Sequence, residues 1–358
     1  MKIAYNYQGN TSVIDKLIDY DLYVLIHNEE QLKELEGYNI NIVNIRNNIY
    51  SYDILISETD NFENIRARRK IVIDKDFDVQ ELLKEKPKRN YKFSIIVPNY
   101  NNAEWINRTI ESVLNQTYKN WEMYIIDDVS TDNSIEVIER YKDNRIKLIK
   151  NKIKWYNGGS RNWGILEAKE SNPDGYLLFI DSDDWLYTDT VLEELNKFII
   201  DEDLITLDFI HYKDGKYVDE TKCRYNDIDD LFMTNGIICA VWSKCFKVSI
   251  APLFEFNTLM EDRNYHYKLI NKIDSYVNFG KVTYVWNKMN KKSITSDEEQ
   301  EYKSDLQTTM NWANCAYRHI AGMLDLLNEI KRPKWKEFIL SRINTMKKLI
   351  RNNQYHQY

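Results

Sequence analysis

The chain has 358 residues, of which 43% are hydrophobic and 29% charged, and its formal net charge is −7. This length suits roughly two or three domains, and the composition excludes a disordered chain because enough apolar residues are present for a sizeable core. The acidic balance also excludes a protein whose whole surface binds nucleic acid or anionic lipid, since such binding needs basic surface.

The cysteines and the N-terminal residues indicate the cellular compartment of the protein. Cys223, Cys239, Cys245 and Cys315 form no CxxC pair and have no regular spacing. They indicate neither a zinc site nor a disulfide framework, and a reducing compartment fits best. No apolar run is as long as a membrane span, and the N-terminus lacks the charged and apolar regions of a signal peptide. We therefore expect a cytoplasmic protein without a transmembrane segment.

Residues 1–90 alternate short β-rich runs with polar stretches that suit helices. The runs begin at Lys2, Asp21, Ile40, Asp53 and Lys70. This pattern predicts βαβ units and a small parallel sheet. The segment contains neither GxGxxG nor GxxxxGK[ST], so the sequence does not support phosphate binding here. We expect a small α/β accessory domain that serves as a scaffold, an acceptor platform or an oligomer contact.

A charged segment that contains Pro87, Lys84–Lys92, is the predicted linker to a second α/β series. Strands are predicted at Phe93–Val97, Glu122–Ile126, Arg145–Lys150 and Tyr176–Ile180, and helices at Ala103–Asn115, Asp132–Tyr141 and Gly159–Lys169. The first and last strands are unbroken apolar runs, as in strands covered on both faces. The sequence predicts a mostly parallel sheet sandwiched by helices over residues 91–295, followed by a helical C-terminal region, 296–358.

The most informative segment is GYLLFIDSDDWL, in which an apolar strand runs directly into Asp181, Ser182, Asp183 and Asp184. Three carboxylates at the end of a buried strand repel one another and are costly to desolvate unless a cation or water offsets their charge. Mg²⁺ and Mn²⁺ commonly combine one or two protein carboxylates with substrate phosphates. Ligands also bind at the carboxyl ends of parallel strands, so a divalent-metal site is predicted here.

Two other strands also end in polar residues. The segment MYIIDDVSTDNS places Asp127 and Asp128 after an apolar strand, where turn and helix-cap chemistry is the alternative explanation. The segment IIVPNYN places Pro98, Asn99 and Tyr100 after another. An aromatic ring at this edge can stack on a base while a carboxylate accepts the imide N–H of that base. The pattern allows a nucleotide site, but for Tyr100 alone a packed loop aromatic is the favoured interpretation.

Three segments together resemble the family 2 glycosyltransferases of GT-A fold. They are SIIVPNYNNAEWINRTIESVLNQTYKNWEMYIIDDVSTDNS, NGGSRNWGI and LLFIDSDDWL, in the family's order and spacing. The resemblance covers Tyr91–Thr295 and is specific as a set, but it covers neither residues 1–90 nor 296–358. It implies a metal-dependent enzyme that transfers a sugar from a UDP-sugar, or a related nucleotide-diphosphate sugar, to an acceptor hydroxyl of a polysaccharide, glycoprotein or glycolipid.

The resemblance also implies how the donor nucleotide is bound. Pro98 and Tyr100 would line the nucleobase site. Asp128, with Asp127 beside it, would read the uracil edge. Arg161 in GGSRN would contact the ribose or phosphate side of the donor.

Further acids would carry the chemistry. Asp181 and Asp183 match the family's DxD motif, and Asp183 and Asp184 would divide ribose contact and coordination of Mn²⁺ or Mg²⁺. In FNTLMEDRNYHYKLI, Asp262 matches the family's catalytic base and Glu261 is its neighbour. On a helix these two side chains point about 100° apart, so only one can aim at the acceptor. A single base without a separate nucleophile implies inversion at the anomeric carbon.

The segment VWNKMNKKSIT resembles the family's late basic segment, which often closes over the diphosphate. The match implies Lys291, Lys292 and Ser293 as phosphate contacts. The family often has Arg or His here, where this chain has Lys and Asn.

Other functions stay open from the sequence alone. A nucleotidyltransferase also surrounds a nucleotide and a carboxylate-bound metal with an α/β sheet, but PNYNNAEW is not a Gly-rich, basic phosphate loop. A binding module with degenerate acids is disfavoured because the whole acid set is present. A transferase acting on a modified nucleic-acid base draws support only from the basic stretch after Lys331. The same stretch leaves peripheral membrane contact as an alternative to a solvated helix face.

Overall fold

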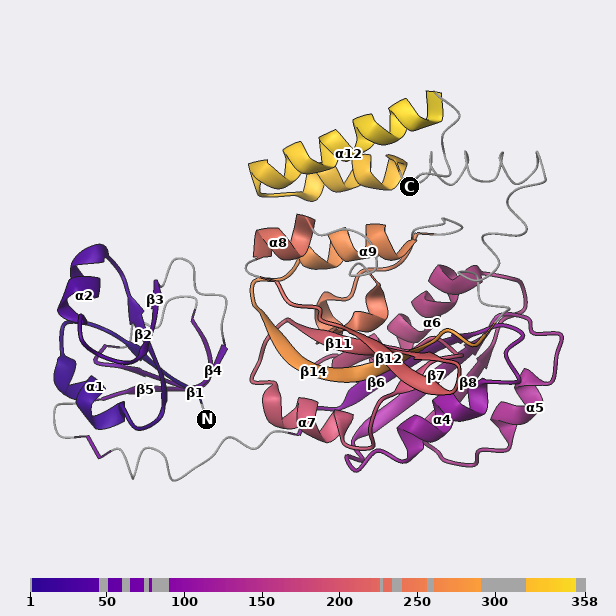
Figure 1. Ribbon diagram of the computed structural model, residues 1–358, viewed down its shortest axis with the longest axis horizontal. Helices are drawn as coiled ribbons and strands as arrows, with labels where there is room; N and C mark the ends of the chain where they lie inside the picture. Colours follow the sequence, from indigo (N-terminus) through magenta and orange to yellow (C-terminus); the bar gives the residue numbers. More distant parts are fainter. Residues whose placement is uncertain are drawn as a thin grey trace. The chain divides into compact units, whose positions relative to one another are not determined.

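The structure is a computed structural model of the chain (Figure 1). It describes residues 2–44, 51–59, 65–73, 77–78, 90–225, 228–233, 240–255, 261–290 and 320–351, so residues 84–89 of the predicted linker lie outside it. The chain divides into two compact units. The smaller contains Met1–Asn90, Asn196–Asp203 and Asp274–Val277, and the larger contains Tyr91–Leu195, Leu204–Ile273 and Asn278–Tyr358.

The smaller unit is built on a five-stranded sheet with the order β3-β2-β1-β4-β5, in which every pair is parallel. The strands are β1 (Lys2–Asn6), β2 (Asp21–Ile26), β3 (Asn41–Asn44), β4 (Ser51–Ser57) and β5 (Arg66–Val72), and the helices of the first two crossovers are α1 (Thr11–Leu17) and α2 (Glu29–Glu34). This is the small parallel sheet that the alternation of apolar and polar runs predicted.

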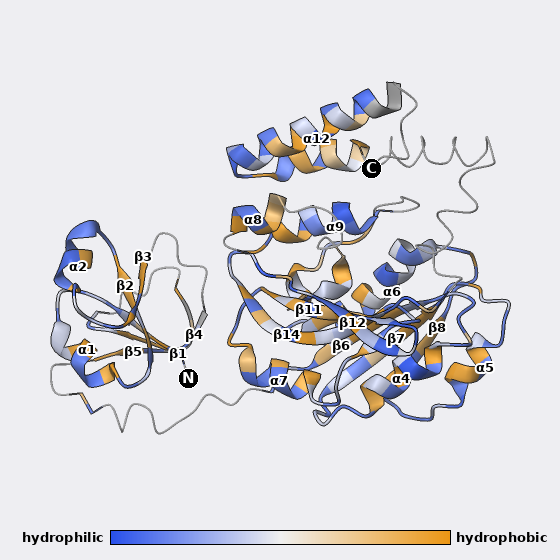
Figure 2. Cartoon of the chain, in the orientation of Figure 1, coloured by the Kyte–Doolittle hydropathy of each residue, from blue (hydrophilic) through white to orange (hydrophobic). Residues whose placement is uncertain are grey.

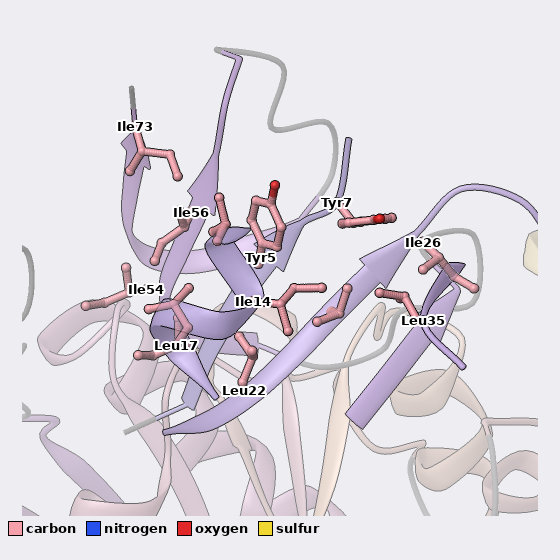
Figure 3. Close-up of a cluster of buried hydrophobic side chains, with 13 residues drawn as sticks. Tyr5, Tyr7, Ile14, Leu17, Leu22, Ile26, Leu35, Ile54, Ile56 and Ile73 are labelled. Atoms are coloured by element: carbon pink, nitrogen blue, oxygen red, sulfur yellow. The ribbon is translucent and has the colours of Figure 1, made fainter. Parts of the chain in front are cut away.

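Packing holds the short helix α1 in place. The side chain of Asn10 caps its first turn, and the buried residues Ile14 and Leu17 gather with Ile54 and Ile56 of β4 in one cluster (Figure 3). Each buried side chain of this size contributes about 1.5–3 kcal/mol. A helix this short is marginal in isolation, so the cluster rather than helix propensity stabilises it.

The larger unit is built on a mixed sheet with the main path β10-β14-β11-β13-β9-β6-β7-β8, and β12 pairs with β11. Its strands are β6 (Phe93–Asn99), β7 (Trp121–Asp127), β8 (Ile146–Lys150), β9 (Tyr176–Phe179), β10 (Trp185–Leu186), β11 (Leu204–Lys213), β12 (Lys216–Thr221), β13 (Lys244–Lys247) and β14 (Tyr276–Asn287). The block β9-β6-β7-β8 is parallel, while β13 is antiparallel to both β9 and β11. The four strands predicted for the parallel block are all present.

Helices cover this sheet. They include α4 (Ile106–Leu114), α5 (Ser134–Glu139), α6 (Tyr156–Ser171) and α7 (Val191–Phe198), and single 3-10 turns lie at Val241–Ser243 and Val248–Ile250. Helix α6 packs closely on β6, because a Cβ added at Gly164 would lie 2.6 Å from Cγ2 of Ile96. The glycine therefore sets the depth at which α6 lies on the sheet.

The remaining helices are α8 (Ile228–Met233), α9 (Glu261–Ile270) and α12 (Pro333–Arg351), and residues 320–329 are also helical. Helix α12 is anchored on α8, since Phe232 stacks on Trp335 with ring centroids 4.0 Å apart and Asp229 accepts a hydrogen bond from Trp335 Nε1 at 2.7 Å. Hydrophilic and hydrophobic residues alternate along α12 (Figure 2). No helix within the described ranges is long and apolar enough to cross a membrane.

Candidate active site

The carboxyl ends of β6, β7 and β9 lie side by side at one edge of the larger sheet. Asn99 at the end of β6 pairs with Asp127 at the end of β7, and β9 is the neighbour of β6 on the other side. The topology therefore places the three polar segments, Pro98–Tyr100, Asp127–Asp128 and Asp181–Asp184, at one edge. This is the edge where open α/β sheets bind ligands.

Asp127 is buried and holds two strand ends together. Its Oδ1 accepts a hydrogen bond from Asn99 Nδ2 at 2.8 Å, and its Oδ2 accepts one from the backbone N–H of Ser130 at 3.0 Å. Only 1% of the residue is exposed. The carboxylate thus shapes the turn that follows β7.

Asp128 fixes the start of α6. Its carboxylate accepts hydrogen bonds from the backbone N–H groups of Trp155 and Tyr156, each at 2.7 Å, and from Asn151 Nδ2 at 2.8 Å. An anion at a helix N-terminus is favourable, so the helix-cap chemistry left as an alternative is present here. A carboxylate offers about four acceptor positions, which leaves one for the imide N–H of a base.

Exposed aromatic rings flank this acid. Tyr100 is 43% exposed, and Lys154 Nζ lies 3.4 Å from the centroid of its ring. Tyr156 is 56% exposed and its ring centroid is 5.5 Å from the same ammonium group. Pro98 is buried within β6. The rings and the cation provide a surface on which a planar base can stack.

The first two acids after β9, Asp181 and Asp183, are half-buried. Asp181 accepts a hydrogen bond from Arg161 Nη2 at 2.7 Å, and Asp183 accepts one from Asn290 Nδ2 at 2.8 Å. Burial, together with the charge of Asp181, raises the pKa of Asp183 to about 6. The charged form of Asp183 is therefore unfavourable in this site unless a cation lies nearby.

Asp184 has a different environment. It is 2% exposed, and its carboxylate accepts hydrogen bonds from the Tyr284 hydroxyl at 2.5 Å and the Asn287 backbone N–H at 2.7 Å. Burial and the charges of Asp183 and Asp181 raise its pKa well above the ordinary value. Both donors belong to β14, so Asp184 fastens the acidic turn to that strand.

We expect Tyr284→Phe to lower the free energy of unfolding by about 1–3 kcal/mol, because the buried Asp184 carboxylate loses a donor. The Tyr284 hydroxyl also accepts the Asp181 backbone N–H at 3.2 Å, so the turn loosens as well. Urea denaturation measures the effect. Tyr265→Phe is the matched control, since its hydroxyl is buried without a partner among the described residues. Equal stability of the two variants would contradict this account.

Arg161 of α6 joins acids from distant parts of the chain. It is 2% exposed; Nη2 donates to Asp181 at 2.7 Å, Nη1 donates to Asp262 at 2.8 Å, and Glu261 Oε1 lies 3.5 Å from Nη1. Burial lowers the pKa of the guanidinium, but the charges of Asp262, Asp181 and Glu261 outweigh burial and raise it. The sequence predicted a donor contact for Arg161, and the structure places its guanidinium against these carboxylates.

Glu261 and Asp262 are the first residues of α9 and have different electrostatic environments. Burial and the charge of Asp262 raise the pKa of Glu261 to about 7. Burial also raises the pKa of Asp262, and its 2.8 Å ion pair with Arg161 opposes that shift. Arg161 is therefore closer to Asp262 than to Glu261, and it stabilises the ionised form of Asp262 more strongly near neutral pH.

The sequence did not predict three residues of this candidate site. Tyr284, Asn287 and Asn290 hold Asp183 and Asp184 from β14 and the turn after it. Only the pairing of β14 with β10, the strand that follows the acidic turn, makes their role visible. The predicted phosphate contacts, Lys291, Lys292 and Ser293, lie outside the described residues.

The donor set partly fits a divalent cation. Asp181 and Asp183 provide carboxylate oxygens, which Mg²⁺ and Mn²⁺ take together with phosphates and water. In the described part of the chain, no group of three or more His, Cys, Asp or Glu side chains is arranged to hold a metal. A cation here would need oxygens from a substrate or water.

Comparisons with known proteins show which proteins part of the chain resembles. Residues 94–252 match the family model for glycosyl transferase family 2. A curated relative from Escherichia coli, UDP-Glc:alpha-D-GlcNAc-diphosphoundecaprenol beta-1,3-glucosyltransferase WfaP, is 41% identical over 103 residues, which are 29% of this chain and 39% of that protein. Poly(ribitol-phosphate) beta-N-acetylglucosaminyltransferase TarP from Staphylococcus aureus is 41% identical over 115 residues, 30% of this chain and 32% of that protein.

A solved structure, S. aureus TarS 1-349 in complex with UDP-GlcNAc, has a TM-score of 0.49 and 17% identity, covering 75% of this chain and 89% of that one. The chain spans about two fifths of the length of the curated relatives that it matches first. Within the larger unit, residues 94–252 thus resemble glycosyl transferase family 2, the family that the sequence motifs indicated.

Proposed function

We propose that this protein is an inverting glycosyltransferase that transfers a sugar from a UDP-sugar to an acceptor hydroxyl. One observation carries the proposal: Arg161 binds Asp181, at the donor-side strand end, and Asp262, at the start of α9, with distances of 2.7 and 2.8 Å. A nucleotide-side acid and a candidate base thus share one buried cation. The match of residues 94–252 to the family supports the same reaction.

For the donor, we propose that the uracil lies between the Tyr100 ring and the Asp128 carboxylate. The exposed ring and the remaining acceptor position of Asp128 support this placement. Asp127 shapes the turn beside them, and Pro98 lies buried near the end of β6. The guanidinium of Arg161 is positioned to orient Asp181 for the ribose rather than to extend into solvent.

For the metal, we propose that Asp183 is the direct ligand of Mn²⁺ or Mg²⁺. Its half-buried carboxylate with a raised pKa supports this role, while both oxygens of Asp184 already accept hydrogen bonds from β14. When bound, the ion would supply Lewis-acid stabilisation of the departing diphosphate. Asn290 holds the Asp183 carboxylate in place at 2.8 Å.

For the transfer step, we propose that Asp262 accepts the proton of the acceptor hydroxyl as the oxygen attacks the anomeric carbon. The bond from that carbon to the diphosphate breaks in the same displacement, so the product has the opposite anomeric configuration to the donor. Proton NMR of the product from an α-linked UDP-sugar is expected to show a β-linkage. An α-linked product would contradict a single displacement.

For the acceptor, we propose a glycoconjugate or a polymer hydroxyl. The name of WfaP gives a UDP-glucose donor and a GlcNAc-diphosphoundecaprenol acceptor, and the name of TarP gives a poly(ribitol-phosphate) acceptor. These relatives support UDP-glucose and UDP-GlcNAc as the first donors to test. A transferase acting on a modified nucleic-acid base stays an alternative, for which oligonucleotide acceptors are the control.

Calorimetric titration of UDP, with and without Mn²⁺, tests the donor site. We expect metal-dependent binding that Asp183→Asn weakens at least about tenfold, because a carboxylate ligand is lost. Asp174→Asn removes the same charge from the exposed turn before β9 and is expected to bind like wild type. No binding of UDP in any condition would contradict the uridine assignment.

Two assays separate this proposal from the other functions. A nucleotidyltransferase would release pyrophosphate from a nucleoside triphosphate, whereas the proposed enzyme releases UDP from a UDP-sugar. A binding module would bind UDP-sugars without releasing UDP in the presence or absence of acceptors. UDP release that requires Asp262 supports the glycosyltransferase over both.

A further inference from the structure

The charge of the chain is unevenly distributed. Residues 331–351 contain eight basic residues and a single acid, Glu337, a local net charge of +7 in a chain whose formal net charge is −7. The rest of the chain therefore carries −14. Such a concentration of one sign marks this segment, which we call the basic segment, as a surface that attracts anions.

One side of the basic segment packs against the rest of the protein. In α12 the side chains of Trp335, Ile339, Ile343 and Met346 are buried. Asp229 of α8 accepts hydrogen bonds from Arg332, Lys334 and Trp335 at 2.7–3.2 Å. These contacts hold α12 as a formed helix, so its other side is presented in a fixed arrangement.

One flank of α12, beside the buried stripe, combines cations with an exposed apolar residue. Lys336, Leu340 and Lys347 lie within about 40° of one another around the helix axis, and all three are exposed, Leu340 by 46%. Lys348 is exposed on the side opposite the buried stripe, next to the exposed acid Glu337. A lysine on each side of a leucine suits a helix that lies on a bilayer, because the leucine enters the headgroup region while the ammonium groups reach lipid phosphates.

We propose that α12 docks the protein peripherally on an anionic lipid surface through Lys336, Leu340, Lys347 and Lys348. Lipid is favoured over nucleic acid because an exposed leucine between two lysines gains nothing from a phosphate backbone, whereas a bilayer interface accepts both groups. None of these four residues belongs to the acids proposed for sugar transfer, so the inference does not depend on the catalytic assignment.

Vesicle sedimentation with the full-length protein tests the inference. The probes are phosphatidylcholine vesicles with and without phosphatidylglycerol, at low and high salt. We expect binding that requires phosphatidylglycerol, is lost at high salt, and falls about 10- to 100-fold in a Lys336→Gln/Lys347→Gln/Lys348→Gln variant. A Leu340→Ser variant is expected to bind more weakly at every salt concentration, because the apolar contribution is not screened.

A matched control distinguishes an effect of the α12 surface from an effect of the protein's total net charge. The triple variant Lys142→Gln/Lys147→Gln/Lys216→Gln removes the same charge from exposed positions elsewhere in the larger unit and is expected to bind vesicles like wild type. Equal loss in both triple variants, or none in the α12 variant, would overturn the inference. Tighter binding of a 30-nucleotide DNA duplex than of vesicles, lost in the α12 variant, would overturn it in favour of nucleic acid. UDP binding reports on the donor site and is expected to be unchanged in every variant.

Discussion

Asp262→Asn is expected to reduce sugar transfer about 10²–10⁴-fold, the usual contribution of a general base, while UDP binding stays within about twofold. The amide keeps the size of the carboxylate but cannot accept the proton of the acceptor hydroxyl. The measurement is release of UDP from UDP-glucose in the presence of a GlcNAc-diphosphate lipid, with calorimetry for the donor site. Loss of UDP binding together with activity would mean that Asp262 maintains the donor site instead.

Glu261→Gln is the matched control, because Glu261 is the neighbouring acid on α9. Its pKa of about 7 leaves it partly protonated at neutral pH, and its Oε1 is 3.5 Å from Arg161 Nη1, against 2.8 Å for Asp262 Oδ1. We expect the Glu261 variant to keep activity within about tenfold. If Glu261→Gln inactivates the enzyme and Asp262→Asn does not, the two roles are reversed.

The location of the candidate site at one edge of the sheet could be predicted from the sequence, because polar residues after apolar strands mark the edge where parallel sheets bind ligands. Asp127 is the last residue of β7, Asp128 follows it, and Asp181 comes two residues after β9, close to where the residue pattern places them. The direction of each side chain could not be predicted. Asp183 and Asp184 are adjacent in the chain, yet Asp183 meets Asn290 while Asp184 is turned to β14. That difference depends on strand pairing more than ninety residues away in sequence, which no local pattern encodes.

The ion-pair partners of Arg161 could not be predicted either. The motif GGSRN places it on α6, but its ion pairs depend on β9 and α9 converging on the same helix face. The family resemblance of this motif implied that Arg161 contacts the ribose or phosphate side of the donor. Burial to 2% exposure and three carboxylates within 3.5 Å favour a different role, which is to position the acids.

Arg161→Met is therefore expected to damage both stability and catalysis. Removing one partner of a buried ion pair costs about 3–5 kcal/mol, because the remaining charges are left uncompensated. Urea denaturation is expected to show a loss of this order. Arg161→Lys retains a charge but cannot reach Asp181 and Asp262 in the same planar geometry, so an intermediate loss is expected.

The pH dependence of transfer distinguishes positioning from direct donor contact. Arg161 opposes the upward pKa shift that burial imposes on Asp262, so removing the cation raises the pKa of Asp262 further. The base must be ionised to act, hence the acidic limb of kcat moves to higher pH in Arg161→Met and much less in Arg161→Lys. A residue that only bound the donor would instead raise KM and leave the acidic limb of kcat in place. A higher KM for the UDP-sugar with an unshifted pH profile would therefore return Arg161 to the donor-binding role that its motif implies.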